Sequence, residues 1–460
     1  MLLGKYLAVV PVTVLLIVFS IFLFITAFLN RDLAMVFLIV AMLLSPQLTI
    51  GAVSNRQDIM VRVDDLLVVI FTMVWLARSS LVKNARFIQK FPINRLVLLY
   101  CCCCIFSTLK GVFLGQVVWL RGLFFVFKYI EYFFIFYLAS SNIVDKKQMV
   151  LYLKIFLIVF AIVNLYALSQ IGHVDRVSAP FQPKGSEPNT LGGYQVLILG
   201  VLIGLLTHAS LRFWKWPLIG LALLTMIPFG YTLSRASYMA LVPMYLTLVF
   251  FNKFATKNIL IAVLMVGIAL FFVFKPAHII NRLQEAVTPE YQENIPTVTL
   301  LGVPLGASAS ARVDDWIDLF HQWTKEPFFG RGVTGARFVD GQYIKVLVET
   351  GLVGFVAFML LIIMVFRQTL KIYNNSKDGL YRGLAIGFLA GHVGMLVHAI
   401  SSNTFIIIRI MEPYWFLAAM VMMIPRLENA TKEDDQTERM KVNPARNVNF
   451  LLQSHWKGSV

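Results

Sequence analysis

Two arginines in this sequence have the type and placement expected of an anion-binding site. Arg235 occurs in TLSRASYMAL, at a turn between two apolar stretches, and Arg312 begins the stretch RVDDWIDLFHQW. Arginine stays charged and presents a fork of donors that matches a phosphate group. Arg312 would also lie near a helix N-terminus, where anions are favoured. We therefore predict that both side chains bind an anion, with a lipid headgroup contact as the alternative for Arg235.

A third charged group stands at the start of an apolar stretch, in GARFVDGQYIKVLVETGLVG. Lys345 and Glu349 are spaced i,i+4, so they are expected to pair on the first turns of a helix and anchor it. Gly351 and Gly354 would allow close helix packing beyond them. Asp340 has no obvious local partner, which makes it the best candidate in this stretch for a catalytic role.

Other polar residues are predicted to lie on the same side of the membrane as Arg235 and Asp340. The stretch PFFGRGVTGARFVDGQY contains glycines that allow a backbone to approach a ligand closely, and RVSAPFQPKGSEPNTLGGY adds polar groups. The candidates for substrate binding are Arg121, Arg176, Asn189, Arg331, Arg337 and Tyr343.

Charges inside apolar helices are costly, so each of them is a functional candidate. In RGLFFVFKYIEYFF, Lys128 and Glu131 lie one turn apart and can pair, either as a structural ion pair or as part of a transport path. His392 and His398 are six residues apart and do not share a helix face, so they are interpreted as packing or hydrogen-bonded residues. His321 could serve a site from the amphipathic stretch.

No metal or cofactor is expected. The four cysteines are consecutive, residues 101–104, and adjacent positions on a helix point about 100° apart. They are therefore interpreted as packing residues. The sequence contains neither a P-loop nor an H-E-x-x-H motif.

The elements that position these residues are predicted to be membrane helices. The chain has 460 residues, of which 58% are hydrophobic and only 14% charged. Apolar runs long enough to cross a bilayer recur from end to end, and the first lacks a signal-peptide cleavage site. We predict an all-α polytopic membrane protein with twelve or thirteen helices, near residues 6–29, 33–50, 64–80, 95–114, 119–139, 149–170, 190–208, 217–233, 236–252, 258–274, 342–366, 380–400 and 404–425. The second is the least secure, because Pro46 and Gly51 interrupt it.

The net charge of +16 is explained by basic loops on one side, which mark the cytoplasm. A nucleic-acid partner is not expected, because no basic-aromatic surface is visible. The chain then divides into N-terminal membrane helices (1–274), an external loop (275–341), C-terminal membrane helices (342–426) and a polar, mobile cytoplasmic tail (427–460). Within the loop, apolar residues at helical spacing from Val313 to Trp323 predict an amphipathic helix, capped by Ser308 or Ser310, on the membrane surface or on the bundle.

Four pieces in order resemble the O-antigen ligase and Wzy-type O-antigen polymerase superfamily: RVSAPF…EPNTLGGY, TLSRASYMAL, SARVDDW and PFFGRGVTGARFVDGQYIKVLVETGLVG. The resemblance implies a GT-C-like glycosyltransferase of the bacterial inner membrane with a large periplasmic loop. It would transfer or polymerise undecaprenyl-pyrophosphate-linked glycan without a metal, for O-antigen, lipopolysaccharide or exopolysaccharide biosynthesis. Arg235 and Arg312 would bind the pyrophosphate. Ligases of the family carry a histidine where this chain has Asp340, which makes Asp340 the nearest candidate base and favours a polymerase or exopolysaccharide relative.

The partners implied are the lipid-linked donor, a glycan or lipid-linked acceptor, membrane lipid and other polysaccharide-assembly proteins. The alternative is a transporter or flippase for an anionic lipid-linked sugar, which Arg121, Lys128 and Glu131 motivate. Transporters often contain repeated halves with charges near the midplane, and no internal repeat is visible here. A non-catalytic assembly scaffold is a third, weaker interpretation.

Overall fold

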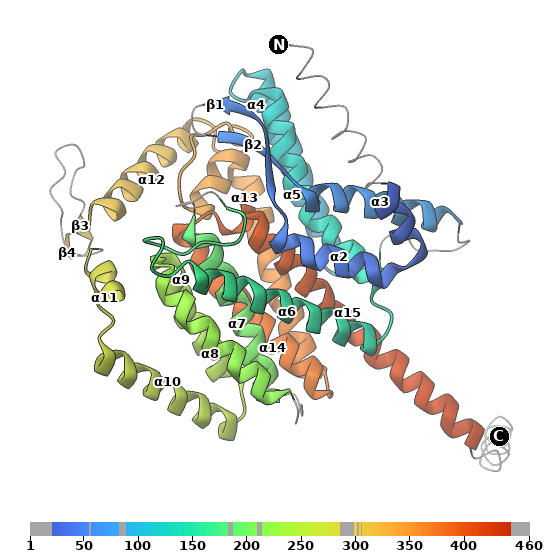
Figure 1. Ribbon diagram of the computed structural model, residues 1–460. Helices are drawn as coiled ribbons and strands as arrows, with labels where there is room; N and C mark the ends of the chain where they lie inside the picture. Colours follow the sequence, from blue (N-terminus) through green and yellow to red (C-terminus); the bar gives the residue numbers. More distant parts are fainter. Residues whose placement is uncertain are drawn as a thin grey trace, which may run out of the picture.

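The computed structural model shows a predominantly helical protein (Figure 1). It describes residues 21–54, 57–81, 89–182, 187–208, 214–285, 299–300, 303–304 and 306–442. Two short antiparallel strand pairs accompany the helices: β1 (Gln47–Ser54) with β2 (Gln57–Arg62), and β3 (Thr299–Leu300) with β4 (Val303–Pro304). The prediction of a predominantly helical membrane protein is therefore confirmed.

The helices follow the predicted order along the chain. Their bounds are α2 Arg31–Leu44, α3 Val63–Leu81, α4 Asn94–Phe113, α5 Trp119–Asn142, α6 Lys146–Ser169, α7 Pro188–His208, α8 Lys215–Tyr231, α9 Arg235–Phe251, α10 Phe254–Phe274, α11 Ala277–Gln284, α12 Ala307–Lys325, α13 Gln342–Asn375, α14 Gly379–Ser401 and α15 Ile408–Val442.

Eight helices in the described part of the chain are long and apolar enough to cross a membrane: α4, α5, α6, α7, α10, α13, α14 and α15. The sequence predicted twelve or thirteen spans. Of the remainder, α8 and α9 are apolar but only 17 residues long, and α3 begins with two acidic residues. Most of the first predicted span, 6–29, lies outside the described residues.

The second predicted span is shorter than expected. The sequence predicted a helix over 33–50, but α2 ends at Leu44 and the chain continues through Pro46 into β1. Proline cannot continue the helical hydrogen-bond ladder, which explains this break. At 1.5 Å per residue, 14 residues reach about 21 Å, less than the hydrocarbon core of about 30 Å.

The centre of the bundle is built on α7 and α14, with α9 against both (Figure 1). Small residues allow these backbones to approach closely, as is common where helices associate in lipid. A methyl group at Gly204 would lie 2.4 Å from the carbonyl oxygen of Gly383, and one at Gly387 would lie 2.6 Å from the Cα of Val201. Substitution at either position would force the two helices apart.

Helix α13 is interrupted at Gly351, whose φ of 67° is outside the helical range. The loop that follows α12 fills this break. Leu352 donates its backbone N–H to the carbonyl of Pro327 at 2.8 Å, and Arg331 donates to the carbonyl of Val348 at 2.9 Å. A side chain at Gly351 would collide with the backbone of Phe328. Gly351 therefore serves close packing, as predicted, although its packing partner is the loop after α12.

The amphipathic helix predicted from the spacing is α12. Its tryptophans turn toward the bundle, where Trp316 and Trp323 pack with Leu319, Val339 and Val348 between α12 and α13. Of the two predicted positions, this favours packing of the tryptophan face of α12 on the bundle over packing on the membrane surface. The predicted serine cap is wrong: Gly306 is the N-cap and makes no side-chain bond, while positions 308 and 310 lie within the helix.

The chain beyond Leu427 does not change to an irregular tail at that point. Helix α15 continues to Val442 and extends away from the bundle (Figure 1). The rest of the predicted cytoplasmic tail, residues 443–460, lies outside the described residues.

Candidate anion site

Four arginines from separate elements form a cluster that we call the arginine cluster: Arg176, Arg235, Arg282 and Arg312. Arg176 lies in the loop before α7, Arg235 begins α9, Arg282 lies in α11 and Arg312 lies in the second turn of α12. Burial and the neighbouring charges of Arg282, Arg235 and Arg312 lower the pKa of Arg176. The cluster thus gathers positive charge from residues 136 positions apart in the chain (312 minus 176).

Two members of the cluster are fixed by backbone carbonyls. Arg176 donates from Nε to the carbonyl of Thr232 at 3.1 Å and from Nη2 to that of Leu233 at 3.0 Å. Arg282 donates to the same Leu233 carbonyl at 3.4 Å and pairs with Glu285 at 2.5 Å. Leu233 has a positive φ of 48°, and this turn presents its carbonyl to both guanidinium groups.

Arg235 is different, because no acidic or carbonyl partner for its guanidinium group is found among the described residues. The side chain is half-buried, and the charges that act on it are those of Arg282 and Arg312 and, more weakly, that of Glu285, which is itself paired with Arg282. It begins α9, so it also lies at a positive helix end. A half-buried cation beside other cations is stabilised by a bound anion, which makes Arg235 the centre of the candidate site.

Asp340 does have a partner, and it is the other arginine predicted for this site. Arg312 Nη2 lies 3.0 Å from Asp340 Oδ2, with the two side chains 29% and 36% exposed. The backbone carbonyl of Asp340 accepts a hydrogen bond from Trp316 Nε1 at 2.7 Å. Residue 341 next to it must be glycine-like, since its φ is 129° and a Cβ there would lie 2.7 Å from Trp316 Nε1.

A second carboxyl group lies close to Asp340. Burial and the negative charge of Asp340 raise the pKa of Glu187, against the hydrogen bond that it accepts from Thr190 Oγ1 at 3.3 Å. Glu187 directly precedes α7. The site therefore combines a cationic cluster with two neighbouring carboxyl groups.

A buried chain of hydrogen bonds supports the start of α9. Ser234 is the N-cap, and its Oγ donates to Asn189 Oδ1 at 2.7 Å. With that proton committed, Ser237 Oγ donates to Ser234 Oγ at 2.7 Å, and His398 Nε2 donates to Ser237 Oγ at 3.2 Å. The other ring nitrogen, Nδ1, then accepts from Thr404 Oγ1 at 2.7 Å.

This series of hydrogen bonds places Asn189 against Ser234 at the start of α9, where it makes a structural contact; the sequence predicted only that Asn189 lies on the same side as Arg235. It also confirms the interpretation of the two histidines. His398 and His392 are both fully buried, and His392 Nδ1 lies 2.8 Å from the hydroxyl of Tyr414.

The remaining predicted residues have other partners. Arg337 forms ion pairs with Asp315 and Asp318 on the outer side of α12. Arg331 donates to Gln322 Oε1 at 2.9 Å, and Tyr343 donates its hydroxyl to the carbonyl of Leu396 at 2.7 Å. Arg121 lies in the first turn of α5, and no contact in the described residues joins it to the arginine cluster.

Two other residues that could act as a base, Glu349 and the His321 suggested by the sequence, are poorly placed for that role. Glu349 is buried, pairs with Lys345 at 3.4 Å as predicted, and accepts the backbone N–H of Thr334 at 2.9 Å. His321 is an exposed residue of α12. The four cysteines are free thiols, with Cys104 buried and Cys102 exposed.

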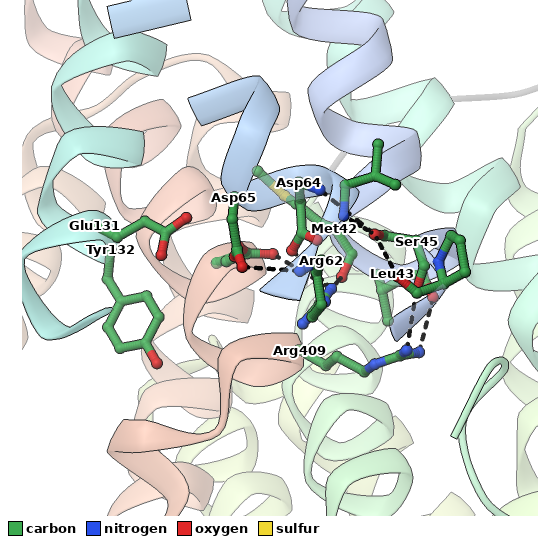
Figure 2. A network of polar contacts seen from close by, with 12 residues as sticks. Met42, Leu43, Ser45, Arg62, Asp64, Asp65, Glu131, Tyr132 and Arg409 are labelled. Atoms are coloured by element: carbon green, nitrogen blue, oxygen red, sulfur yellow. Dashed lines mark hydrogen bonds and ion pairs between the residues drawn. The ribbon is translucent and has the colours of Figure 1, made fainter. Parts of the chain in front are cut away.

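Sequence reasoning missed a second group of charges inside the bundle, part of which Figure 2 shows. The predicted pair of Lys128 with Glu131 is confirmed at 3.0 Å, but Lys128 also pairs with Asp65. Farther in, Arg62 pairs with Asp64 and Glu412. Asp64, Asp65 and Glu412 bring enough carboxylate oxygens together to attract a cation. The guanidinium group of Arg62, which pairs with two of them, already is such a cation. Applying the rule on charges in apolar helices to Arg409 and Glu412 would have found this group.

The arginine cluster can hold a di- or polyanion at the end of the bundle and place it beside two carboxyl groups, one of which can accept a proton. No protein-family model matches this sequence, and no curated protein matches it significantly.

Proposed function

We propose that this protein is a membrane glycosyltransferase that transfers or polymerises a glycan carried on undecaprenyl pyrophosphate at the periplasmic face of the bacterial inner membrane. The observation that carries the proposal is Arg235, a half-buried guanidinium group that makes no ion pair in the described residues and lies among the charges of Arg176, Arg282 and Arg312, with Glu285 as the one acid that acts on it. The resemblance to O-antigen ligases and polymerases supports the same substrate. A GT-C-like membrane core with twelve spans is part of this proposal.

The chemistry follows from the charges that develop. An acceptor hydroxyl attacks the anomeric carbon of the donor sugar, a carbon–oxygen bond forms, and the bond from that carbon to the pyrophosphate breaks. The polyprenyl pyrophosphate leaves with the electron pair and gains negative charge, which preorganised arginines stabilise. The acceptor proton passes to a carboxylate, for which Asp340 is the nearest candidate.

The contact of Arg312 with Asp340 gives this scheme a resting state. Without substrate, Asp340 partly neutralises Arg312. A pyrophosphate has more negative charge and better bidentate geometry for a guanidinium group than one carboxylate. Its binding would draw Arg312 away and leave Asp340 free to accept a proton.

The test is reconstitution of the purified protein in liposomes with a lipid-linked donor and a glycan acceptor. Transfer or elongation that is lost in Arg235→Ala and Arg312→Ala, with both variants still folded in the membrane, supports the proposal. Full activity in either variant contradicts it.

A transporter for an anionic lipid-linked sugar is the second candidate, and the buried charges around Lys128 favour it. The same liposomes separate the two, because a transporter moves the donor to the other leaflet and forms no glycosidic bond. Translocation that depends on Lys128 and not on Arg235 would favour the transporter.

A further inference from the structure

Seven charged side chains form a network where the hairpin of β1 and β2 (the N-terminal hairpin) meets the bundle, and Figure 2 shows part of it. Most of it is closed to solvent. Its members come from β2, α3, α5 and α15 and are Arg62, Asp64, Asp65, Lys128, Glu131, Arg409 and Glu412. Four of these groups are acidic and three are basic.

The inner half of the network is centred on Arg62. Its Nη2 lies 2.7 Å from Asp64 Oδ2 and 3.8 Å from Glu412 Oε2, and it donates to the carbonyl of Met42 at 2.7 Å. The side chains of Asp64 and Glu412 are 0% exposed, and that of Arg62 is 2% exposed. Burial alone would lower the pKa of Arg62, but the carboxyl groups of Asp64, Glu412 and Asp65 outweigh it and raise the pKa.

The outer half is centred on Lys128, which pairs with Asp65 and with Glu131. Tyr132 lies beside it on α5 and donates its hydroxyl to the carbonyl of Ile406 at 2.9 Å, so it supplies no proton to the carboxyl groups. One cation therefore faces two carboxyl groups in this half, as in the inner half.

The third cation, Arg409, does not pair directly with an acid in the described residues. It donates to the carbonyl oxygens of Leu43, Pro180 and Ser45. Its charge nevertheless counts toward the network, because Asp64 and Glu412 interact with it electrostatically. With every group ionised, three positive and four negative charges would leave one net negative charge.

An uncompensated charge in a low-dielectric interior is so costly that the group usually takes up a proton instead. The contacts indicate where that proton goes. Asp64, Asp65 and Glu412 each place a carboxylate oxygen within 4.8 Å of the other two. Neither oxygen of Glu412 has a hydrogen-bond donor among the described residues, although its side chain is fully buried.

We infer that Asp64 and Glu412 form a proton-binding pair in which the two carboxyl groups share one proton. A single O–H···O⁻ bond between them supplies the donor that Glu412 lacks and reduces the net charge of the network to zero. The alternative ligand, a metal ion, would meet the guanidinium group of Arg62, which already lies among the same oxygens. This inference does not depend on the proposed glycan chemistry.

The pair joins the start of α3 to α15, so loss of the proton would weaken the attachment of the N-terminal hairpin. The folded protein would hold a proton at neutral pH that the unfolded chain releases. Stability must then fall as pH rises from neutral, with the unfolding equilibrium constant increasing about tenfold per pH unit once the unfolded carboxyl groups are ionised.

The first experiment is infrared spectroscopy of the full-length protein in lipid at neutral pH, with exchange into deuterium oxide to identify carboxylic-acid bands. We expect one protonated-carboxyl band that is absent from both Asp64→Asn and Glu412→Gln. Glu349→Gln is the matched control, since Glu349 is a buried acid with a lysine partner, and the band should persist in it. A wild-type protein without such a band, or a band that survives both variants, overturns the inference.

The second experiment measures unfolding between neutral and alkaline pH. Glu412→Gln has the charge of the protonated pair and should fold, and we expect it to lose the pH dependence of the wild type. An unchanged slope would contradict the inference. Stabilisation by added Na⁺ or Mg²⁺ that is present in the wild type and lost in Glu412→Gln would assign the site to a metal ion instead.

Discussion

Arg312 Nη2 lies 3.0 Å from Asp340 Oδ2, so the residue predicted to bind pyrophosphate is paired with the residue predicted to act as base. They are 28 positions apart and come from α12 and from the loop that enters α13. The ion pair explains how a carboxylate can lie beside the arginine cluster when no substrate is bound. It also means that substitutions at either residue affect the other.

Arg235→Ala should reduce glycan transfer by about a hundredfold or more, because it removes a preorganised donor to the developing charge. Arg235→Lys should restore little of this, since lysine lacks the bidentate fork. Initial rates in liposomes at equal protein content measure both. Arg426→Ala is the control. Arg426 is exposed and lies in α15, 18 residues after its first residue, Ile408, which is about 27 Å along the helix at 1.5 Å per residue. Equal losses in Arg235→Ala and Arg426→Ala would mean that general damage, not anion binding, causes the effect.

Asp340→Asn should decrease the rate by about 10² to 10⁴-fold if Asp340 accepts the acceptor proton, while stability changes by less than about 1 kcal/mol. The small stability effect follows from the exposure of its ion pair with Arg312, because exposed pairs contribute little. The rate is measured with saturating donor, and the unfolding free energy in detergent. Normal activity in Asp340→Asn would transfer the role of base to another group, and Glu187 is a carboxyl group on which the charge of Asp340 acts.

The sequence was sufficient for local features whose cause is local. The i,i+4 spacing of Lys345 and Glu349 predicted their ion pair, and helical spacing from Val313 to Trp323 predicted α12. Pro46 was recognised as an interruption, although the hairpin of β1 and β2 that follows it was not. Such patterns report the preferences of a few consecutive residues.

The features that the sequence did not reveal depend on tertiary contacts. Arg282 is an ordinary residue of a short helix until α11 places it against the Leu233 carbonyl. Asp340 looked unpartnered because its partner lies in another helix. The sequence around Gly351 suggested helix packing, but its φ of 67° accommodates the loop after α12, which no nearby sequence pattern predicts.

Glu349→Ala should destabilise the protein by about 3–5 kcal/mol, because it leaves the buried cation of Lys345 without a counter-charge. The side chains are 3% and 9% exposed, and Glu349 also accepts the backbone N–H of Thr334. The double variant Lys345→Met with Glu349→Leu should lose less than the single variant, since no unpaired charge remains. Reversible unfolding in detergent measures both.

Arg337→Ala is the control for that pair. Arg337 is 50% exposed in its ion pairs with Asp315 and Asp318, so its replacement should change the unfolding free energy by less than about 1 kcal/mol. A similar small change in Glu349→Ala would show that the Lys345 charge is solvated or otherwise compensated.

Glu187 predicts a pH dependence with a definite sign. Its pKa in the folded protein is raised from the ordinary value of 4.5, by burial and then by Asp340, so the folded protein holds this proton more tightly than the unfolded chain. The resulting stability is fully present below pH 4.5 and is lost as pH rises through the folded pKa. Glu187→Gln should flatten the profile of unfolding free energy across this window. It should also bind inorganic pyrophosphate more tightly above the window, because one negative charge near Asp340, the partner of Arg312, is removed.

Glu326 provides the matched comparison because its sign is opposite. Burial would raise its pKa, but hydrogen bonds from Lys110 and Gln116 and the charges of Lys110 and Arg331 outweigh this and lower it. Its contribution is present above the unfolded pKa and is lost as pH falls through the folded value, so Glu326→Gln should lose stability mainly near neutral pH. If both variants shift the profile in the same direction, the desolvation of Glu187 and its proximity to Asp340 are not what controls its proton.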